Sequence, residues 1–272
     1  MKLLTDYGFP LAVIAGLVAL WEVLCRIVRI PVWLLPAPSA IVRDTWTWAD
    51  RIPGHLWVTF YETVGGFAVS VLVGVPLAIA IVYSPLMRRV LYPILLVVQS
   101  VPKVALAPLF LIWIGYGPKS NILIAAIVAF FPMVVNTAAG LESVEPDLLQ
   151  LTHALQASAL RVFWKVRLPW ALPHIFSGMK VAMSLAVIGA VVGEFVGSDR
   201  GLGYLILTAS SNMNTAIVFG VMAVLSALGM VVFWAVCLAE RLACPWYLPP
   251  DGERREDATV EKPASAARDA RA

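Results

Sequence analysis

Few residues of this sequence have the types and spacing that chemistry requires. Residues 115–120, Gly-Tyr-Gly-Pro-Lys-Ser, look superficially like a phosphate-binding loop. The G-x-x-x-x-G-K-[ST] pattern that cradles a nucleotide is absent from the whole chain. The three cysteines (Cys25, Cys237 and Cys244) form no Cys-x-x-Cys pair, and no histidine has an acidic or cysteine partner at ligand spacing. We therefore predict no catalytic residue, no metal site and no nucleotide hydrolysis by this chain.

Lys103 is the charge whose position most needs a physical explanation. It lies about 12 residues into a hydrophobic segment, a distance of about 18 Å along a helix and near the centre of a bilayer. A lysine there costs on the order of 3 kcal/mol on insertion scales. Two interpretations stay open. Lys103 lines a path through the membrane together with Gln99, one turn earlier on the same face, or it is satisfied by carbonyls that the helix breaks at Pro102 and Pro108 set free.

Two glutamates complete the candidates for such a path. Glu194 lies about 19 residues into its hydrophobic segment, and Glu62 lies near the corresponding outer end of another. Either carboxylate could form an outer gate or pair with Arg200. An ordinary carboxylate at the membrane interface is the alternative for both.

The longest charged interruption between hydrophobic segments covers residues 142–173. Pro146 suits the first position of a helix, and Asp147 places a negative charge at the positive end of the helix dipole. The apolar positions that follow recur at spacings of three and four: Leu148, Leu151, Thr152, Leu155 and Ala159. A short exposed helix with such a stripe is typical of a docking element for another protein, although a surface helix lying on its own bundle gives the same pattern.

Composition and span length predict an all-α integral membrane protein. Of the 272 residues, 60% are hydrophobic and 14% are charged, which is not the composition of a soluble core. The net charge of +3 is too small and too scattered to indicate a nucleic-acid partner. Each hydrophobic run has roughly the 20 residues that a bilayer requires. The six predicted transmembrane helices cover residues 10–28, 58–82, 91–114, 121–141, 175–197 and 216–238.

The distribution of basic residues predicts the orientation. Arg161, Lys165 and Arg167 lie in the 142–173 loop, and the positive-inside rule assigns such a cluster to the cytoplasm. Six spans with this loop inside place both termini in the cytoplasm. Most other basic residues agree, whereas Arg26 and Arg29 beside the first span do not.

We expect one transmembrane domain, residues 1–248, followed by a cytoplasmic tail, residues 249–272. The tail is rich in Pro, Ala and charged residues and has almost no apolar ones. Such a composition cannot bury enough surface to offset the entropy of ordering, so we predict that the tail is disordered.

The 142–173 loop resembles the Glu-Ala-Ala loop of the permease subunits of bacterial ABC importers. That pattern is Glu-Ala-Ala, three residues, Gly, nine residues, Ile-x-Leu-Pro, and it falls here on residues 150–152, Gln156 and residues 166–169. The closing Leu-Pro keeps its spacing, while Gln-Leu-Thr replaces Glu-Ala-Ala and Gln156 replaces Gly. Because that Gly usually serves a left-handed turn, either Gln156 bears a strain on the order of 1 kcal/mol or the turn is built differently.

Residues 59–67, 101–110 and 193–205 resemble the nitrate, sulfonate and taurine branch of the same permeases, so that the resemblance covers roughly residues 10–248. It implies a type I importer permease fold with a coupling helix between spans four and five. The positions it implies for contact with an ATPase subunit are Asp147, Leu148, Gln150, Leu151, Thr152, Ala154, Leu155, Gln156, Ala157 and Pro169.

The resemblance also implies the setting of the protein. It would be a multi-pass subunit of the bacterial inner membrane that works with cytoplasmic ATPase subunits carrying ATP and Mg²⁺, a second permease copy and a periplasmic substrate-binding protein. The substrate would be a small nutrient such as nitrate, a sulfonate or taurine, or a pyrimidine or aromatic compound. Two rival classes are considered beside it: an ion-coupled secondary transporter, which would need inverted repeats and several intramembrane acids, and a membrane scaffold that uses the loop only for docking.

Overall fold

The computed structural model describes residues 2–247, and within that range every regular element is a helix. The predicted tail, residues 249–272, lies outside the described residues. The elements in chain order are α1 (Lys2–Ile27), α2 (Pro38–Trp46), α3 (Ile52–Tyr83), α4 (Pro85–Gln99), the 3₁₀ helix η1 (Lys103–Leu106), α5 (Ala107–Ile114), α6 (Pro118–Glu142), α7 (Pro146–Ala154), α8 (Ala159–Val162), the π-helix η2 (Phe163–Arg167), α9 (Leu168–Gly197), α10 (Leu202–Ser211) and α11 (Thr215–Ala243).

Proline sets where most of these helices begin. A proline at the first or second helical position loses no hydrogen bond, because the amide it lacks would have no partner inside the helix. The prolines at helix starts are Pro38, Pro53, Pro85, Pro108, Pro118, Pro146 and Pro169.

The all-α membrane fold predicted from the sequence is confirmed, but the number of spans is not. Among the described residues, four helical stretches are long and apolar enough to cross a bilayer: α3, α6, the continuous stretch from Ala159 to Gly197, and α11. A fifth is added if α4 and the η1–α5 stretch count as one broken span. Helix α1 coincides with the first predicted span, and the total of six stays a prediction.

The third predicted span, residues 91–114, is not one straight helix. Helix α4 ends at Gln99, and the chain resumes as η1 at Lys103 after a bend of 87°. Pro102 explains the break, because proline excludes the helical conformation from the residue before it and cannot donate its own backbone hydrogen bond. The segment is therefore a broken span or a re-entrant loop.

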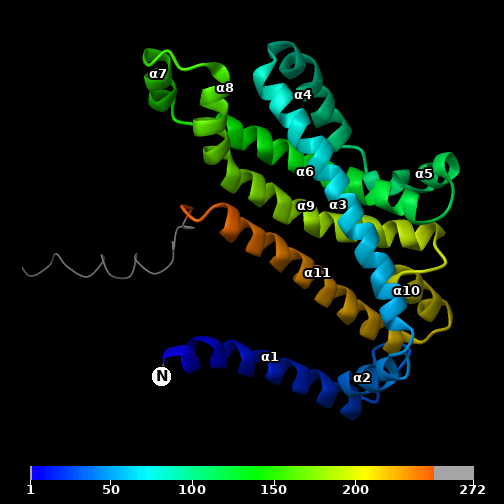
Figure 1. The fold of residues 1–272 in the computed structure, drawn as a ribbon. Coiled ribbons are helices and arrows are strands. Elements are labelled where there is room, and N and C mark those ends of the chain that lie inside the picture. The colour runs from blue at the N-terminus through cyan, green and yellow to red at the C-terminus, as the bar shows by residue number, and fades with distance from the viewer. Residues whose placement is uncertain (1, 248–272) are drawn as a thin grey trace, which may run out of the picture.

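Helix α6 forms the centre of the molecule and packs against both α3 and α9 (Figure 1). Small residues allow the close approach. A Cβ atom at Gly66 of α3 would meet the Ala125 side chain and lie 2.9 Å from the amide nitrogen of Ala126. At the same residue of α6, a Cβ at Gly189 of α9 would lie 2.6 Å from Ala125 Cα. Such small-residue contacts let helices associate where lipid supplies no hydrophobic driving force.

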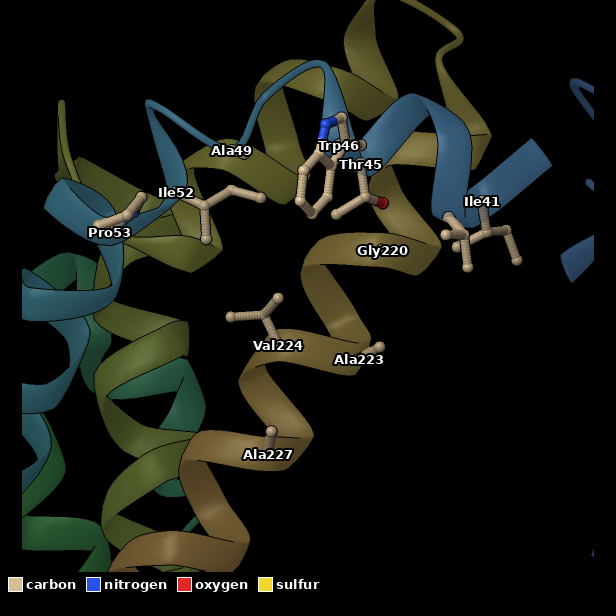
Figure 2. Close-up of a pocket in the computed structure, with 11 residues that line it drawn as sticks. Ile41, Thr45, Trp46, Ala49, Ile52, Pro53, Gly220, Ala223, Val224 and Ala227 are labelled. Atoms are coloured by element: carbon tan, nitrogen blue, oxygen red, sulfur yellow. The ribbon is translucent and has the colours of Figure 1, made fainter. Parts of the chain in front are cut away.

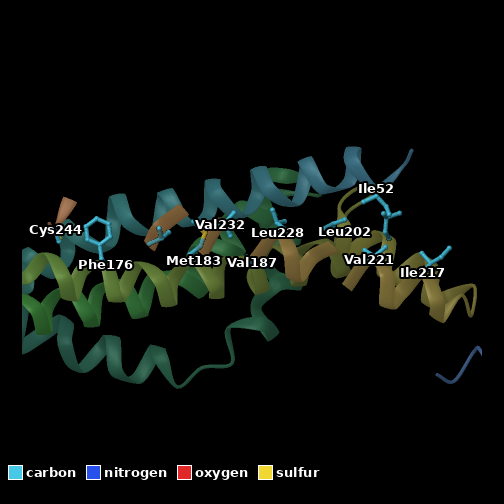
Figure 3. Packing of buried hydrophobic residues seen from close by; sticks show 13 residues of the cluster. Ile52, Phe176, Met183, Val187, Leu202, Ile217, Val221, Leu228, Val232 and Cys244 are labelled. Atoms are coloured by element: carbon cyan, nitrogen blue, oxygen red, sulfur yellow. The ribbon is translucent and has the colours of Figure 1, made fainter. Parts of the chain in front are cut away.

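A second layer joins α9 to α11 and α10. Its buried apolar side chains run in a row along the helices (Figure 3). The row begins near Cys244 and Phe176 and ends near Leu202 and Ile217. Helices α7 and α8 lie at the opposite end of the molecule from α2 and α10 (Figure 1).

Gly66→Ala tests the close packing of α3 on α6. The added methyl group has no space and forces the helices apart, which typically costs about 1–3 kcal/mol. We expect a lower melting temperature and a lower yield of monodisperse protein in detergent. Gly229→Ala on α11 is the matched control, because its Cβ would meet nothing within 4 Å and alanine favours a helix. Equal stability of the two variants would contradict this account.

Candidate functional site

A helix lies where the sequence predicts a docking element, and it has the start that the sequence indicates. Helix α7 has Pro146 in its first turn and Asp147 as the acidic residue there. It ends at Ala154, earlier than the predicted stripe, so Leu155 is the C-cap and Ala159 belongs to α8. The stripe therefore runs across a helix end rather than along one helix.

Gln156 has a left-handed backbone, with φ of +52°. Its amide donates to the His153 carbonyl oxygen at 2.9 Å, and the Ala157 amide donates to the Thr152 carbonyl oxygen at 3.0 Å. These two bonds form the Schellman motif, which closes a helix and satisfies its last carbonyls. The premise drawn from the family's glycine is confirmed: the turn is left-handed, and a glutamine occupies it.

Three apolar side chains of this loop, Leu151, Leu155 and Leu160, are largely exposed; they are called the coupling surface here, after the role that the sequence predicts for them. These three side chains are 56%, 72% and 69% exposed. The other positions predicted to contact an ATPase differ in exposure. Exposed are Asp147, Gln150, Ala154 and Gln156, and half-buried are Leu148, Thr152, Ala157 and Pro169. Three exposed leucines within ten residues are typical of a surface that another protein covers.

A small cavity of about 210 Å³ separates the end of α7 from the bundle. Tyr83 of α3, His153 and Arg167 supply its polar lining, and the Arg167 guanidinium lies 5.2 Å from the centre of the Tyr83 ring. From Ala159 the chain passes through the π-turn η2 into α9 without a break. At α7, a cavity therefore lies between the loop and the bundle, whereas at its other end the loop continues directly into α9.

Lys103 lies at the bend between α4 and α5. Its Nζ atom is 4.5 Å from the centre of the Phe131 ring of α6, a cation–π contact that partly replaces hydration. No carboxylate pairs with it among the described residues. Gln99 is exposed at the end of α4, so the two side chains do not share one continuous helix.

Glu62 and Glu194 come together in a buried polar cluster, although the sequence placed them only at similar depth. Both are almost completely buried. Glu194 Oε1 accepts from Thr59 Oγ1 at 2.6 Å, and Glu62 Oε1 accepts from Asn121 Nδ2 at 2.9 Å. Neither glutamate pairs with Arg200 among the described residues. The cluster joins α3, α6 and α9.

The same cluster holds the start of α10. Glu194 Oε2 accepts from the Gly203 amide at 2.5 Å, Thr59 Oγ1 accepts from the Leu202 amide at 2.8 Å, and His55 Nδ1 accepts from the Gly201 amide at 3.0 Å. A carboxylate at a helix start also interacts favourably with the helix dipole.

Sequence reasoning missed His55, Thr59 and Asn121 in this cluster. The one local signal was Gly-Leu-Gly at residues 201–203, shortly after Glu194. A Cβ at Gly201 or Gly203 would collide with the Glu194 carboxylate, so these glycines mark a close approach.

An apolar groove of about 550 Å³ opens between α2, α11 and the start of α3 (Figure 2). Trp46, Thr45 and Ile52 border it on one side and Gly220, Ala223 and Val224 on the other. Within the part of the chain that the structure describes, no group of three or more His, Cys, Asp or Glu side chains could hold a metal ion.

Comparison with known proteins gives consistent results. The family described as "Binding-protein-dependent transport system inner membrane component" matches residues 70–242. A probable ABC transporter permease of Haemophilus influenzae is 34% identical over 84% of this chain and 93% of its own length. The formylaminopyrimidine transport permease ThiX of Halalkalibacterium halodurans is 33% identical over 85% of this chain and 92% of its own length.

The fold is also found among solved structures. An inward-facing structure of the MetNI methionine ABC transporter superimposes with a TM-score of 0.62 and 20% identity, covering 77% of this chain and 98% of the matched chain. The likeness at this identity concerns the fold.

Gln156→Gly tests the strain in the α7 turn. Glycine adopts the left-handed conformation without steric cost, so the variant should stabilise the loop by about 1 kcal/mol. Amide hydrogen exchange of residues 146–157 should slow roughly fivefold. Ala157→Gly, at the next position, is the control and should accelerate exchange, because it only adds freedom to the unfolded loop. Faster exchange in Gln156→Gly would show that the side chain, not the backbone, secures the turn.

Proposed function

Because this chain belongs to the family of binding-protein-dependent transport system inner membrane components, we propose that it forms the substrate path of an ATP-driven importer and takes its energy from a separate cytoplasmic ATPase subunit. Members of this family are multi-pass inner-membrane permeases rather than enzymes. Their assignment as ABC permeases replaces both rival interpretations, the ion-coupled transporter and the scaffold.

The exposed leucines of the coupling surface are the observation that carries this proposal. Leu151 on the short helix α7 and Leu155 at its C-cap are both largely exposed. A groove on the ATPase subunit would bury them. Burial of one leucine side chain contributes about 1.5–3 kcal/mol, so a few such contacts are enough to seat the helix.

The connection of the loop to α9 suggests how docking drives transport. Since α8, η2 and α9 are continuous, movement of the docked loop displaces the cytoplasmic end of α9. Closure of an ATPase dimer would thus draw the inner ends of the spans together and open the path on the outer side. ATP and Mg²⁺ would be bound by the ATPase subunits, and this chain would bind no cofactor.

The assembly would contain a second permease copy, two ATPase subunits and a periplasmic substrate-binding protein. With the coupling surface in the cytoplasm, α10 faces the periplasmic side. Both termini would then be cytoplasmic. The position of the end of α11 on the same side as α7 supports this orientation (Figure 1).

The substrate would be a small nutrient. Related permeases are named for the transport of formylaminopyrimidine or taurine and for the import of nitrate. Lys103 favours an anionic substrate or one with an electron-rich group, since a cation attracts such ligands along a path of low dielectric constant. The further candidates for the path are Gln99, Glu62 and Glu194. The two glutamates would act there as members of the buried polar cluster at the α10 end.

Leu155→Asp tests the coupling surface. The substitution places a charge in an apolar contact and should reduce ATPase association at least tenfold, while the permease still inserts in the membrane. Co-purification with its cognate ATPase subunit gives the measurement. Leu155→Met keeps the apolar surface and should bind normally. Normal assembly and transport of the aspartate variant would move the docking contact elsewhere.

Lys103→Met tests the path. It keeps the approximate length of the side chain and removes the charge, so uptake should fall at least tenfold while assembly and basal ATP turnover persist. Uptake of the ligand of the neighbouring binding protein into proteoliposomes measures this. Lys119→Met removes an exposed lysine at the start of α6 and should leave uptake unchanged. Uptake by Lys103→Met at the wild-type rate over all concentrations would exclude Lys103 from the path.

A further inference from the structure

An ion pair links the span that starts at the coupling loop to the last span of the chain. Lys180 Nζ of α9 lies 2.5 Å from Glu240 Oε2 of α11, and the two side chains are 26% and 15% exposed. The other described ion pairs differ in kind. Arg26 and Glu22 lie within one helix, and Arg88 and Glu142 are largely exposed. The Lys180–Glu240 pair is thus the most buried of the three.

Buried apolar side chains flank this pair along both helices. Phe176 and Met183 of α9 and Val232 and Val236 of α11 belong to one buried apolar cluster. Apolar side chains allow packed helices to slide by small steps, because such contacts have little directional preference. An ion pair is directional, and separating it in apolar surroundings leaves two unpaired charges, which is strongly unfavourable. The pair therefore fixes the register of α11 on α9.

The position of the pair relates it to the coupling loop. Lys180 is about 18 Å along α9 from Leu168, and α9 continues the loop without a break. Helix α11 has no comparable connection: the chain reaches it from the far end, through α10. Among the described residues, no other polar side-chain contact joins α9 to α11.

We propose that Lys180 and Glu240 are positioning residues that make α11 move together with α9 when the ATPase displaces the coupling loop. This inference rests on the proposed function, since it assumes an ATPase that acts on the loop. The coupling loop is joined directly to α9 and not to α11. The ion pair would explain how α11 takes part in the conformational cycle.

The test measures the separation of the two helices in two states of the full complex. Spin labels are placed at Ile188→Cys on α9 and Met230→Cys on α11, both exposed in the wild-type protein, after replacement of the three native cysteines by serine. Distances are measured with the ATPase subunits bound, without nucleotide and with ATP and vanadate. The wild-type pair should give the same distance in both states.

Removal of the pair should release α11. In Lys180→Met and in Glu240→Gln the label distance should change by about 1–2 Å or more between the states, the scale of helix shifts in such transitions. The exchanged pair, Lys180→Glu with Glu240→Lys, should restore the constant distance. Arg26→Met removes a cation from an ion pair within α1 and should behave as wild type.

Three outcomes overturn the proposal: a constant distance in both neutral variants, a changing distance in the wild type, or failure of the exchanged pair to restore it while assembled. A purely structural ion pair would lower stability in all states without creating a difference between them. The proposed function fails separately, and visibly, if the wild-type permease neither binds the ATPase nor supports its ATP turnover.

Discussion

Inside a bilayer a polar side chain has no water to bind, and this constraint accounts for where the polar residues of the spans lie. Glu62 and Glu194 meet a hydroxyl, an amide and backbone N–H groups. Lys103 faces an aromatic ring, and Lys180 faces a carboxylate. Each of these four side chains has a partner on another helix, so these contacts also help to fix which helices are neighbours.

The two ends of the molecule differ in how firmly their helices are held. At the α10 end, buried side chains bind the backbone of a helix start and leave little freedom there. At the α7 end, a short helix is held by its own turn and by the continuous stretch into α9, with a cavity behind it. An element that has to follow a moving partner is better served by the second arrangement, because few buried contacts must break when it shifts.

The sequence predicted the elements whose signals are local. Pro146 located the start of α7, and hydrophobic length located α3, α6, α9 and α11. The helix break at Pro102 was predicted, but the bend of 87° was not, because a hydropathy run does not record direction. Proline only permits the bend, and its angle depends on packing.

The polar cluster could not be predicted for another reason. Glu62 and Glu194 are far apart in the chain, and no spacing rule reports a contact between two separate helices. The pair of Lys180 and Glu240 was not predicted either, since its two residues lie on different helices. Contacts of this kind depend on how the helices are arranged, and the residue pattern of a single helix does not predict that arrangement.

The close fit around Ala125 has a consequence for how such a protein can diverge. Neither neighbouring helix leaves room for one more carbon atom there, so α3, α6 and α9 accept few substitutions along their contact lines. We expect sequence change that adapts the protein to a new cargo to accumulate in the elements around these three helices. The sequences of α3, α6 and α9 would then change slowly among relatives. The surrounding elements would change faster and would account for differences in what the relatives transport.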